Sequence, residues 1–197
     1  MGLVDRVKKI LLSPRQEWEV IDTETATVGS LYTGYILPLA AIPPICQAIG
    51  YSVFGIHMPF VGTYRTPIGS AVTSAVVQYV LTLVVVYVVA LIIDNLAPTF
   101  GGTKNSIQAL KVAAYSYTPA WIAGIFALIP GLRFLGILGL YSLYLLYLGL
   151  PVLMKSPKEK ALGYTVVVIV VGVVLSIIVG VVAARFVSGP ALGGFTP

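Results

Sequence analysis

Long apolar segments alternate with short polar segments along most of the chain. A helix needs about 20 apolar residues to cross a bilayer. Five segments are long enough, and they cover residues 31–55, 68–95, 107–129, 133–154 and 162–187. Residues that favour turns, mainly Pro, Gly, Asn and Ser, separate these segments. The pattern therefore predicts an all-α protein with five transmembrane helices, of which the third and fourth form a tight hairpin at Pro130 and Gly131.

The first thirty residues follow a different pattern. At 100° per residue, one side of the first helix collects Leu3, Val4, Val7, Ile10 and Leu11, and the other side collects Asp5, Arg6, Lys8 and Lys9. This arrangement is typical of a helix that lies in the membrane interface. Ser13 and Pro14 end it and begin a second short helix, which would hold Trp18 at headgroup depth. The alternative is a membrane-proximal tail that is only partly ordered.

Composition places the chain in a broad class. Of its 197 residues, 58% are hydrophobic and 10% are charged, and the mean hydropathy is +0.97. A soluble domain cannot cover its surface with so few polar groups, so the sequence predicts an integral membrane protein. The net charge of +5 comes from scattered residues without interleaved aromatics, which argues against nucleic acid as a partner.

The positions of the basic residues predict an orientation. With a cytoplasmic N-terminus, that side holds Arg6, Lys8, Lys9, Arg15, Lys104, Lys111, Lys155, Lys158 and Lys160, and the other side holds only Arg65, Arg133 and Arg185. The positive-inside rule favours this arrangement. We therefore divide the chain into a cytoplasmic interfacial segment (1–30), a transmembrane domain (31–187) and a short external tail (188–197).

Polar residues within the apolar segments are costly unless a partner satisfies them. The second helix repeats Ser70, Ser74, Gln78 and Thr82 every four residues, and the third carries Lys104, Gln108, Lys111, Tyr115 and Thr118 on one face. Asp94 stands near the negative end of its helix dipole and needs a nearby cation. We expect an intramembrane polar cluster of Gln78, Asp94, Asn95, Lys104, Gln108, Lys111, Tyr115 and Thr118. Alternatively, Asp94 and the lysines reach separately into the headgroup region.

Two further patterns concern how the helices pack. Pro119 interrupts the third helix and frees the carbonyl of Tyr115, which Ser116 or Thr118 can satisfy. The first helix contains Pro38, Pro43 and Pro44, and such kinks either match helix shapes, which we favour, or line a cavity. Gly172, Ser176 and Gly180 form a small-residue surface for helix packing, either within one chain or in a homo-oligomer.

Groups that could carry chemistry are few. His57 has no acidic or histidine neighbour in sequence, and Cys46 is the single cysteine, so no metal site is expected. "GGTK" at 101–104 lacks the spacing of a phosphate-binding loop. We expect no cofactor and no enzymatic activity. The leading interpretation is a protein that organises or remodels membrane, or that scaffolds other membrane proteins, with lipid as its main partner. The alternative is a small transporter or channel for a solute or ion, using the polar faces of the second and third helices.

Several segments together resemble a known family. They are "ILLSPRQEWEVID", "YILPLAAI", "GGTKNSIQALKVAAYSYTP", "ALIPGLRFLGILGLYSLYLLYLGL" and "SPKEKALGYTVVVIVV". In this order they resemble prokaryotic members of the Yip family, five-helix membrane proteins named for eukaryotic relatives that bind Ypt/Rab GTPases. The resemblance implies a cytoplasmic N-terminus, an external C-terminus and a prokaryotic plasma membrane. The sequence lacks the "DLYGP" motif and the long N-terminal domain of the eukaryotic relatives, so GTPase binding is not expected.

Overall fold

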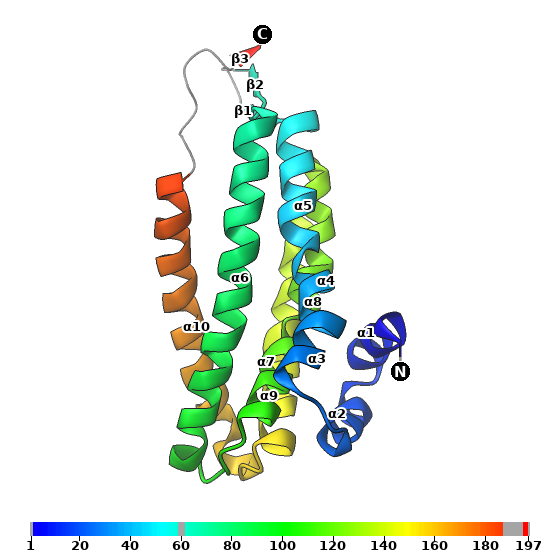
Figure 1. The fold of residues 1–197 in the computed structure, drawn as a ribbon, viewed down its shortest axis with the longest axis vertical. Helices are drawn as coiled ribbons and strands as arrows, with labels where there is room; N and C mark the ends of the chain where they lie inside the picture. Colours follow the sequence, from blue (N-terminus) through cyan, green and yellow to red (C-terminus); the bar gives the residue numbers. More distant parts are fainter. Residues whose placement is uncertain (1, 59–61, 187–194, 197) are drawn as a thin grey trace.

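The computed structural model describes residues 2–58, 62–186 and 195–196. Long helical segments lie side by side in an elongated bundle (Figure 1). Helices α1 (Leu3–Leu12) and α2 (Pro14–Thr23) lie beside the lower part of this bundle, and three short strands lie at its upper end. We call α1 and α2 together the N-terminal hairpin. The end of the bundle beside this hairpin is the hairpin end, and the opposite end, which carries the strands, is the strand end (Figure 1).

The first long segment is interrupted by its prolines. It consists of α3 (Val28–Leu31), the wide turn η1 (Tyr32–Ile36), α4 (Leu37–Ala40), α5 (Ile42–Ile49) and the wide turn η2 (Gly50–Phe54). Pro38 lies in the first turn of α4 and Pro43 in the first turn of α5, where a missing backbone donor is tolerated. Thr27 caps α3, since its Oγ1 accepts a 3.1 Å hydrogen bond from the backbone nitrogen of Ser30.

Two helices are long and uninterrupted. Helix α6 (Ile68–Leu96) is followed by the tight turn η3 (Ala97–Phe100), and α10 (Lys158–Phe186) closes the bundle. Both agree with the expected segments 68–95 and 162–187. Their valine-rich exposed faces, including Val76 and Val80 on α6 and Val170 on α10, would be unfavourable in water but suit contact with lipid.

The third expected helix, 107–129, is divided into three pieces. They are α7 (Ser106–Ser116), α8 (Thr118–Ala123) and η4 (Gly124–Leu128). Asn105 begins α7 by accepting a 3.1 Å hydrogen bond from the backbone nitrogen of Gln108. At the other end, a Cβ added to Gly50 would lie 2.3 Å from the carbonyl oxygen of Ala127. The three pieces therefore run from the start of α7 to the strand end of the first segment.

The fourth segment begins earlier than expected. It comprises the narrow helix η5 (Pro130–Leu140) and α9 (Tyr141–Leu153), whereas the sequence pattern placed it at 133–154. Across the described residues, four helical segments are long and apolar enough to cross a membrane: Val28–Phe54, Ile68–Phe100, Pro130–Leu153 and Lys158–Val181. Four of the five predicted transmembrane helices are therefore long and apolar enough in the structure. The segment 106–128 does not meet this requirement of length and hydropathy, because it is divided into three shorter pieces.

A small sheet joins the strand end of the bundle, which the sequence pattern did not predict. Strands β1 (Ile56–Met58) and β2 (Gly62–Tyr64) pair antiparallel, and β3 (Phe195–Thr196) adds to β2. The expected external tail, 188–197, lies outside the described residues except for β3. The side chain of His57, the single histidine, also lies outside them.

Candidate functional site: the N-terminal hairpin and its buried ion cluster

Helices α1 and α2 form as the sequence pattern predicts, but they pack against the bundle. Ile10, Trp18 and Ile21 are completely buried. Tyr141 donates a 3.1 Å hydrogen bond from its Oη to the carbonyl oxygen of Leu11. Because Tyr141 lies near the middle of the segment Pro130–Leu153, this bond fixes the end of α1 partway along the bundle, as Figure 1 also shows.

Trp18 occupies a space left by a glycine of α9. A Cβ added to Gly149 would lie 2.7 Å from Cζ2 of the Trp18 ring. On its other side the ring meets Tyr115 edge-on, with 6.2 Å between ring centroids. Trp18 is therefore buried between α9 and α7, because Gly149 lets the indole approach the α9 backbone. Its position at headgroup level stays a prediction.

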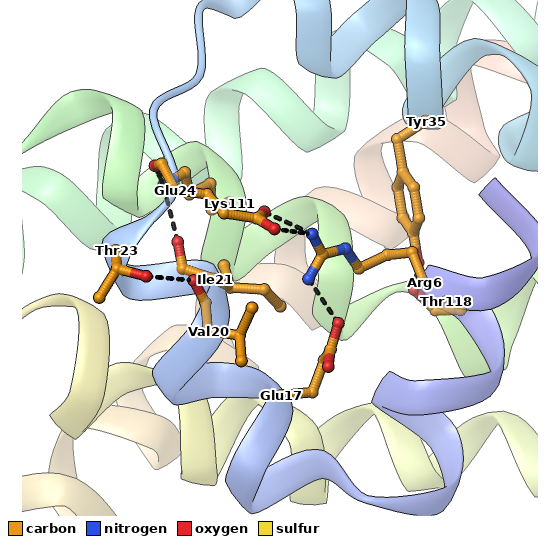
Figure 2. Close-up of polar contacts among 9 residues, drawn as sticks. All are labelled: Arg6, Glu17, Val20, Ile21, Thr23, Glu24, Tyr35, Lys111 and Thr118. Atoms are coloured by element: carbon orange, nitrogen blue, oxygen red, sulfur yellow. Dashed lines mark hydrogen bonds and ion pairs between the residues drawn. The ribbon is translucent and has the colours of Figure 1, made fainter. Parts of the chain in front are cut away.

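Arg6 is the centre of a buried ion cluster. Its guanidinium forms ion pairs with Glu17 of α2 and with Glu24, which follows α2 (Figure 2). Arg6 is 6% exposed and Glu17 is 4% exposed, and the guanidinium also lies 5.6 Å from the centre of the Tyr115 ring. The helical pattern predicted that Arg6 lies on the polar side of α1 with Lys8 and Lys9, and this prediction is wrong for Arg6. Arg6 turns inward because two carboxylates compensate its buried charge.

The electrostatics of this cluster keep Arg6 charged. Burial by itself lowers the pKa of the Arg6 guanidinium, but the hydrogen bond that Arg6 donates to Glu24 and its electrostatic interactions with Tyr115, Glu24 and Glu17 outweigh burial. The net result is a pKa raised above the ordinary value. The hairpin therefore contains a permanent buried cation whose two acidic partners come from the same short segment.

Lys111 connects the hairpin to α7. Its Nζ donates a 2.8 Å hydrogen bond to the carbonyl oxygen of Ile21 and a 2.5 Å hydrogen bond to that of Glu24. These carbonyls lie at the C-terminal end of α2, where a helix lacks internal donors and its dipole favours a cation. Lys111 is only 2% exposed. This lysine therefore caps α2 from within the bundle (Figure 2).

A short chain of hydrogen bonds lies behind the cluster. The Thr118 hydroxyl donates a 2.7 Å hydrogen bond to the carbonyl oxygen of Tyr115, which Pro119 leaves without its usual helical donor. Tyr35 of the first segment lies 2.7 Å from the same hydroxyl, and since Thr118 donates to Tyr115, Tyr35 donates to Thr118. The expectation that a local hydroxyl would satisfy the Tyr115 carbonyl is confirmed. The chain joins the first segment to the break between α7 and α8.

The expected polar cluster with Asp94 does not form as one unit. Lys104 donates a 2.8 Å hydrogen bond to Oδ1 of Asn95 at an exposed position. Gln108 donates a 3.0 Å bond to the carbonyl oxygen of Asp22, and Lys111 also turns toward α2. Within the described residues, Oδ1 of Asp94 has no hydrogen-bond partner. The N-terminal hairpin covers the polar face of α7. Carbonyl oxygens at the end of α2, and not Asp94, accept the hydrogen bonds of Gln108 and Lys111.

The other expected site residues also separate. Gln78 lies away from the ion cluster, in a cavity between α5, α6 and α10. Among the described residues, no atom lies within 4 Å of a Cβ added to Gly172 or Gly180, and Ser176 bonds to its own helix at 2.8 Å. Packing of this small-residue surface within one chain is therefore not observed. Packing in a homo-oligomer stays a prediction.

Sequence reasoning missed the acidic half of the site. Glu17 and Glu24 are seven residues apart with Ile21 between them, so their spacing would place all three on one side of a continuing helix, although α2 ends at Thr23. An apolar residue flanked by acids on a buried side would have indicated an internal cation. A third acid, Asp22, pairs with Lys155 at 2.5 Å on the more exposed side. Within the part of the chain that the structure describes, no three acidic, histidine or cysteine side chains gather as a metal site would require.

These features define a multi-pass α-helical membrane protein with an N-terminal hairpin docked on its bundle. Residues 8–180 match the model of the Yip1 domain, and the chain belongs to this family. The chain is 29% identical over 166 residues to "Inner membrane protein YohC" of Escherichia coli K12 and, equally, to the protein of that name in the E. coli O6:H1 strain CFT073. Each alignment covers 82% of this chain and 85% of the relative. No solved structure matches.

Proposed function

We propose that this protein is a non-enzymatic inner membrane protein that organises or remodels the bilayer through its N-terminal hairpin. One observation carries the proposal: α1 is fixed against the middle of a membrane-spanning segment by the Tyr141–Leu11 hydrogen bond, and Ile10 of the same helix is completely buried. A helix fixed at this depth occupies area within one leaflet. Inserting area into one leaflet favours curvature of the membrane toward that side.

The outer face of α1 suits this role. Val4 is 62% exposed and Leu12 is 81% exposed, although both are apolar. Lys8 and Lys9 are also exposed, and their long apolar stems allow the ammonium groups to reach the headgroups. The inner face of α1 is occupied by the bundle. Its outer face is therefore amphipathic and is available to lipid.

We also propose that the segment 106–128 is a fifth crossing and that the N-terminus is cytoplasmic. The segment extends between the two ends of the bundle, and its polar face is covered by α2, which reduces the cost of placing Lys111 in the membrane. Lys104, Lys155 and Lys158 lie at the hairpin end, as the positive-inside rule requires of a cytoplasmic side. The matched relative named as an inner membrane protein supports this location. Cysteine labelling in intact cells tests the topology: with Cys46 replaced by Ser, Lys104→Cys should be protected and Arg65→Cys should react.

Vesicle shape tests the proposed function. Full-length protein is reconstituted at a fixed lipid ratio, and vesicle diameters are measured by electron cryomicroscopy. The wild type should produce narrower vesicles or tubules, and the pair Val4→Ser and Leu12→Ser should restore the diameters of protein-free vesicles. The control pair Val76→Ser and Val80→Ser changes two valines on α6 that are also exposed and should behave like the wild type. Identical diameters for the wild type and protein-free vesicles would refute the proposal.

A second candidate is transport of a small polar solute. The cavity that contains Gln78 has a volume of roughly 450 Å³ and also presents Gln47, Tyr51, Thr66 and Ser74. These side chains offer hydrogen bonds to a solute in the half of the bundle next to the strands, while Pro44, Ala71 and Val179 give the same cavity apolar walls. Toward the hairpin end, Lys111, Tyr115 and Thr118 are buried and bonded, so the polar lining ends there. Solute flux into proteoliposomes that is abolished by Gln78→Leu would favour transport over membrane organisation.

A further inference from the structure

A second cavity lies between α2, α9 and α10, on the side of α2 that faces away from the ion cluster. At 100° per residue, Arg15 and Glu19 lie on one side of α2, and Glu17 lies on the other. The cavity has a volume of roughly 390 Å³ and is lined by Arg15, Glu19 and Lys158 together with Trp18, Leu148 and Val152.

The cavity carries two cations from different helices. Arg15 belongs to the first turn of α2 and Lys158 is the first residue of α10. Within the described ranges, neither forms an ion pair. Lys158 also stands at the N-terminus of a long helix, where unpaired backbone N–H groups and the helix dipole favour an anion. The two cations and this helix end converge on one opening.

Trp18 closes the inner side of the cavity. Its side chain is completely buried, so its Nε1–H, which has no hydrogen-bond acceptor among the described residues, is not accessible to a ligand there. The indole therefore contributes an apolar wall.

The remaining lining identifies the kind of ligand. Leu148 and Val152 of α9 give the cavity an apolar side, and its basic opening lies at the end of the membrane-spanning segments, at headgroup level. A molecule with an anionic group joined to an apolar chain satisfies both parts. We propose that this cavity binds the headgroup of an anionic phospholipid from the leaflet that contains the hairpin.

The charges predict which phospholipid is preferred. Arg15 and Lys158 contribute two positive charges and Glu19 contributes one negative charge, which leaves one net positive charge at the cavity. This matches the single negative charge of a phosphodiester such as phosphatidylglycerol. A phosphomonoester such as phosphatidic acid carries additional negative charge that Glu19 would repel. This site does not depend on the proposed function, because lipid can bind here whether or not α1 bends the membrane.

Native mass spectrometry of the full-length protein in detergent tests the site. Phosphatidylglycerol should bind at least tenfold more tightly than phosphatidylcholine. The pair Arg15→Gln and Lys158→Gln should lose about tenfold in affinity for phosphatidylglycerol, since charge-assisted hydrogen bonds are lost. The pair Arg65→Gln and Lys104→Gln removes the same charge from exposed positions outside the cavity and should retain wild-type affinity.

The source of the anion is distinguished in the same experiment. Inorganic phosphate and glycerophosphate, which lack acyl chains, should not displace phosphatidylglycerol at equal concentration. Displacement by either one would show an anion site without a lipid component and would overturn the proposal. Equal affinity for phosphatidylglycerol and phosphatidylcholine, or unchanged affinity in the Arg15 and Lys158 pair, would also overturn it. Vesicle diameters do not enter this test, so its failure leaves the proposed function untouched.

Discussion

Arg6 of α1 forms a buried ion pair with Glu17 of α2, and the same guanidinium also pairs with Glu24. All three residues belong to the first twenty-four of the chain, so the N-terminal hairpin supplies its own counter-ions. The bundle contributes an aromatic wall, Tyr115, and the cap Lys111. The hairpin is therefore held by interactions inside it and by interactions with the bundle, and these can be tested separately.

Replacing Arg6 by Met should destabilise the protein by about 3 kcal/mol, because it leaves the buried carboxylate of Glu17 without a cation. Thermal unfolding in detergent measures this loss. Lys8→Met removes an exposed charge from the same helix and should change stability by less than about 0.5 kcal/mol. The triple change Arg6→Met, Glu17→Leu and Glu24→Gln removes the whole cluster and should recover much of the loss. Equal effects of the Arg6 and Lys8 variants would contradict the buried cluster.

The pKa of Arg6 predicts how this stability depends on pH. A raised pKa in the folded state means that the contribution of Arg6 is complete below the ordinary pKa of arginine and is lost only as pH rises through the higher folded pKa. The stability difference between the wild type and Arg6→Met should therefore stay constant from neutral to moderately alkaline pH. Thermal unfolding across that range checks it. If the stability difference between the wild type and Arg6→Met decreases within this pH range, the raised pKa of Arg6 is contradicted.

Lys111→Met should loosen α2 while leaving the bundle folded. The change removes the donor shared by the carbonyls of Ile21 and Glu24. Hydrogen exchange of the α2 amides should become faster, and exchange in α6 should be unchanged. Lys104→Met serves as the control, because Lys104 bonds only to Asn95 at an exposed site. Unchanged exchange in α2 would show that Lys111 does not hold the hairpin.

Gly149→Val should destabilise the protein by about 1–3 kcal/mol, because the added atoms collide with the Trp18 ring. Gly172→Ala should be neutral or slightly stabilising, because its added methyl group meets open space among the described residues. Thermal unfolding compares the two. If Gly149→Val is as stable as Gly172→Ala, the indole does not occupy the space above Gly149.

Asp94→Leu should leave the melting temperature in detergent unchanged or raise it slightly. Oδ1 of Asp94 is buried without a partner in the part of the chain described, so the carboxylate is not stabilised by Lys104 or Lys111. The aspartate-centred cluster expected from the sequence requires the opposite result. A large fall in the melting temperature would restore that interpretation.

The sequence predicted the elements of this fold better than their contacts. Apolar length located the segments that contain α6 and α10, and the amphipathic pattern located α1, because these properties are local. Pro119 indicated the break between α7 and α8, but the pattern could not show that the segment continues as the narrow helix η4, since hydropathy does not distinguish the two kinds of helix. It also could not show whether the polar face of α7 meets α6 or α2. That choice depends on the carbonyls at the end of α2, which no side-chain pattern reveals.

The cap provided by Lys111 has a consequence for the order of assembly. The hairpin is synthesised first, yet its cap, the Tyr141 hydroxyl and the space above Gly149 come from residues made much later. Until α7 and α9 are in place, the earliest part of the chain has nothing to dock on. Docking of the hairpin therefore reports that the rest of the bundle has been completed, and an undocked N-terminus marks an unfinished molecule.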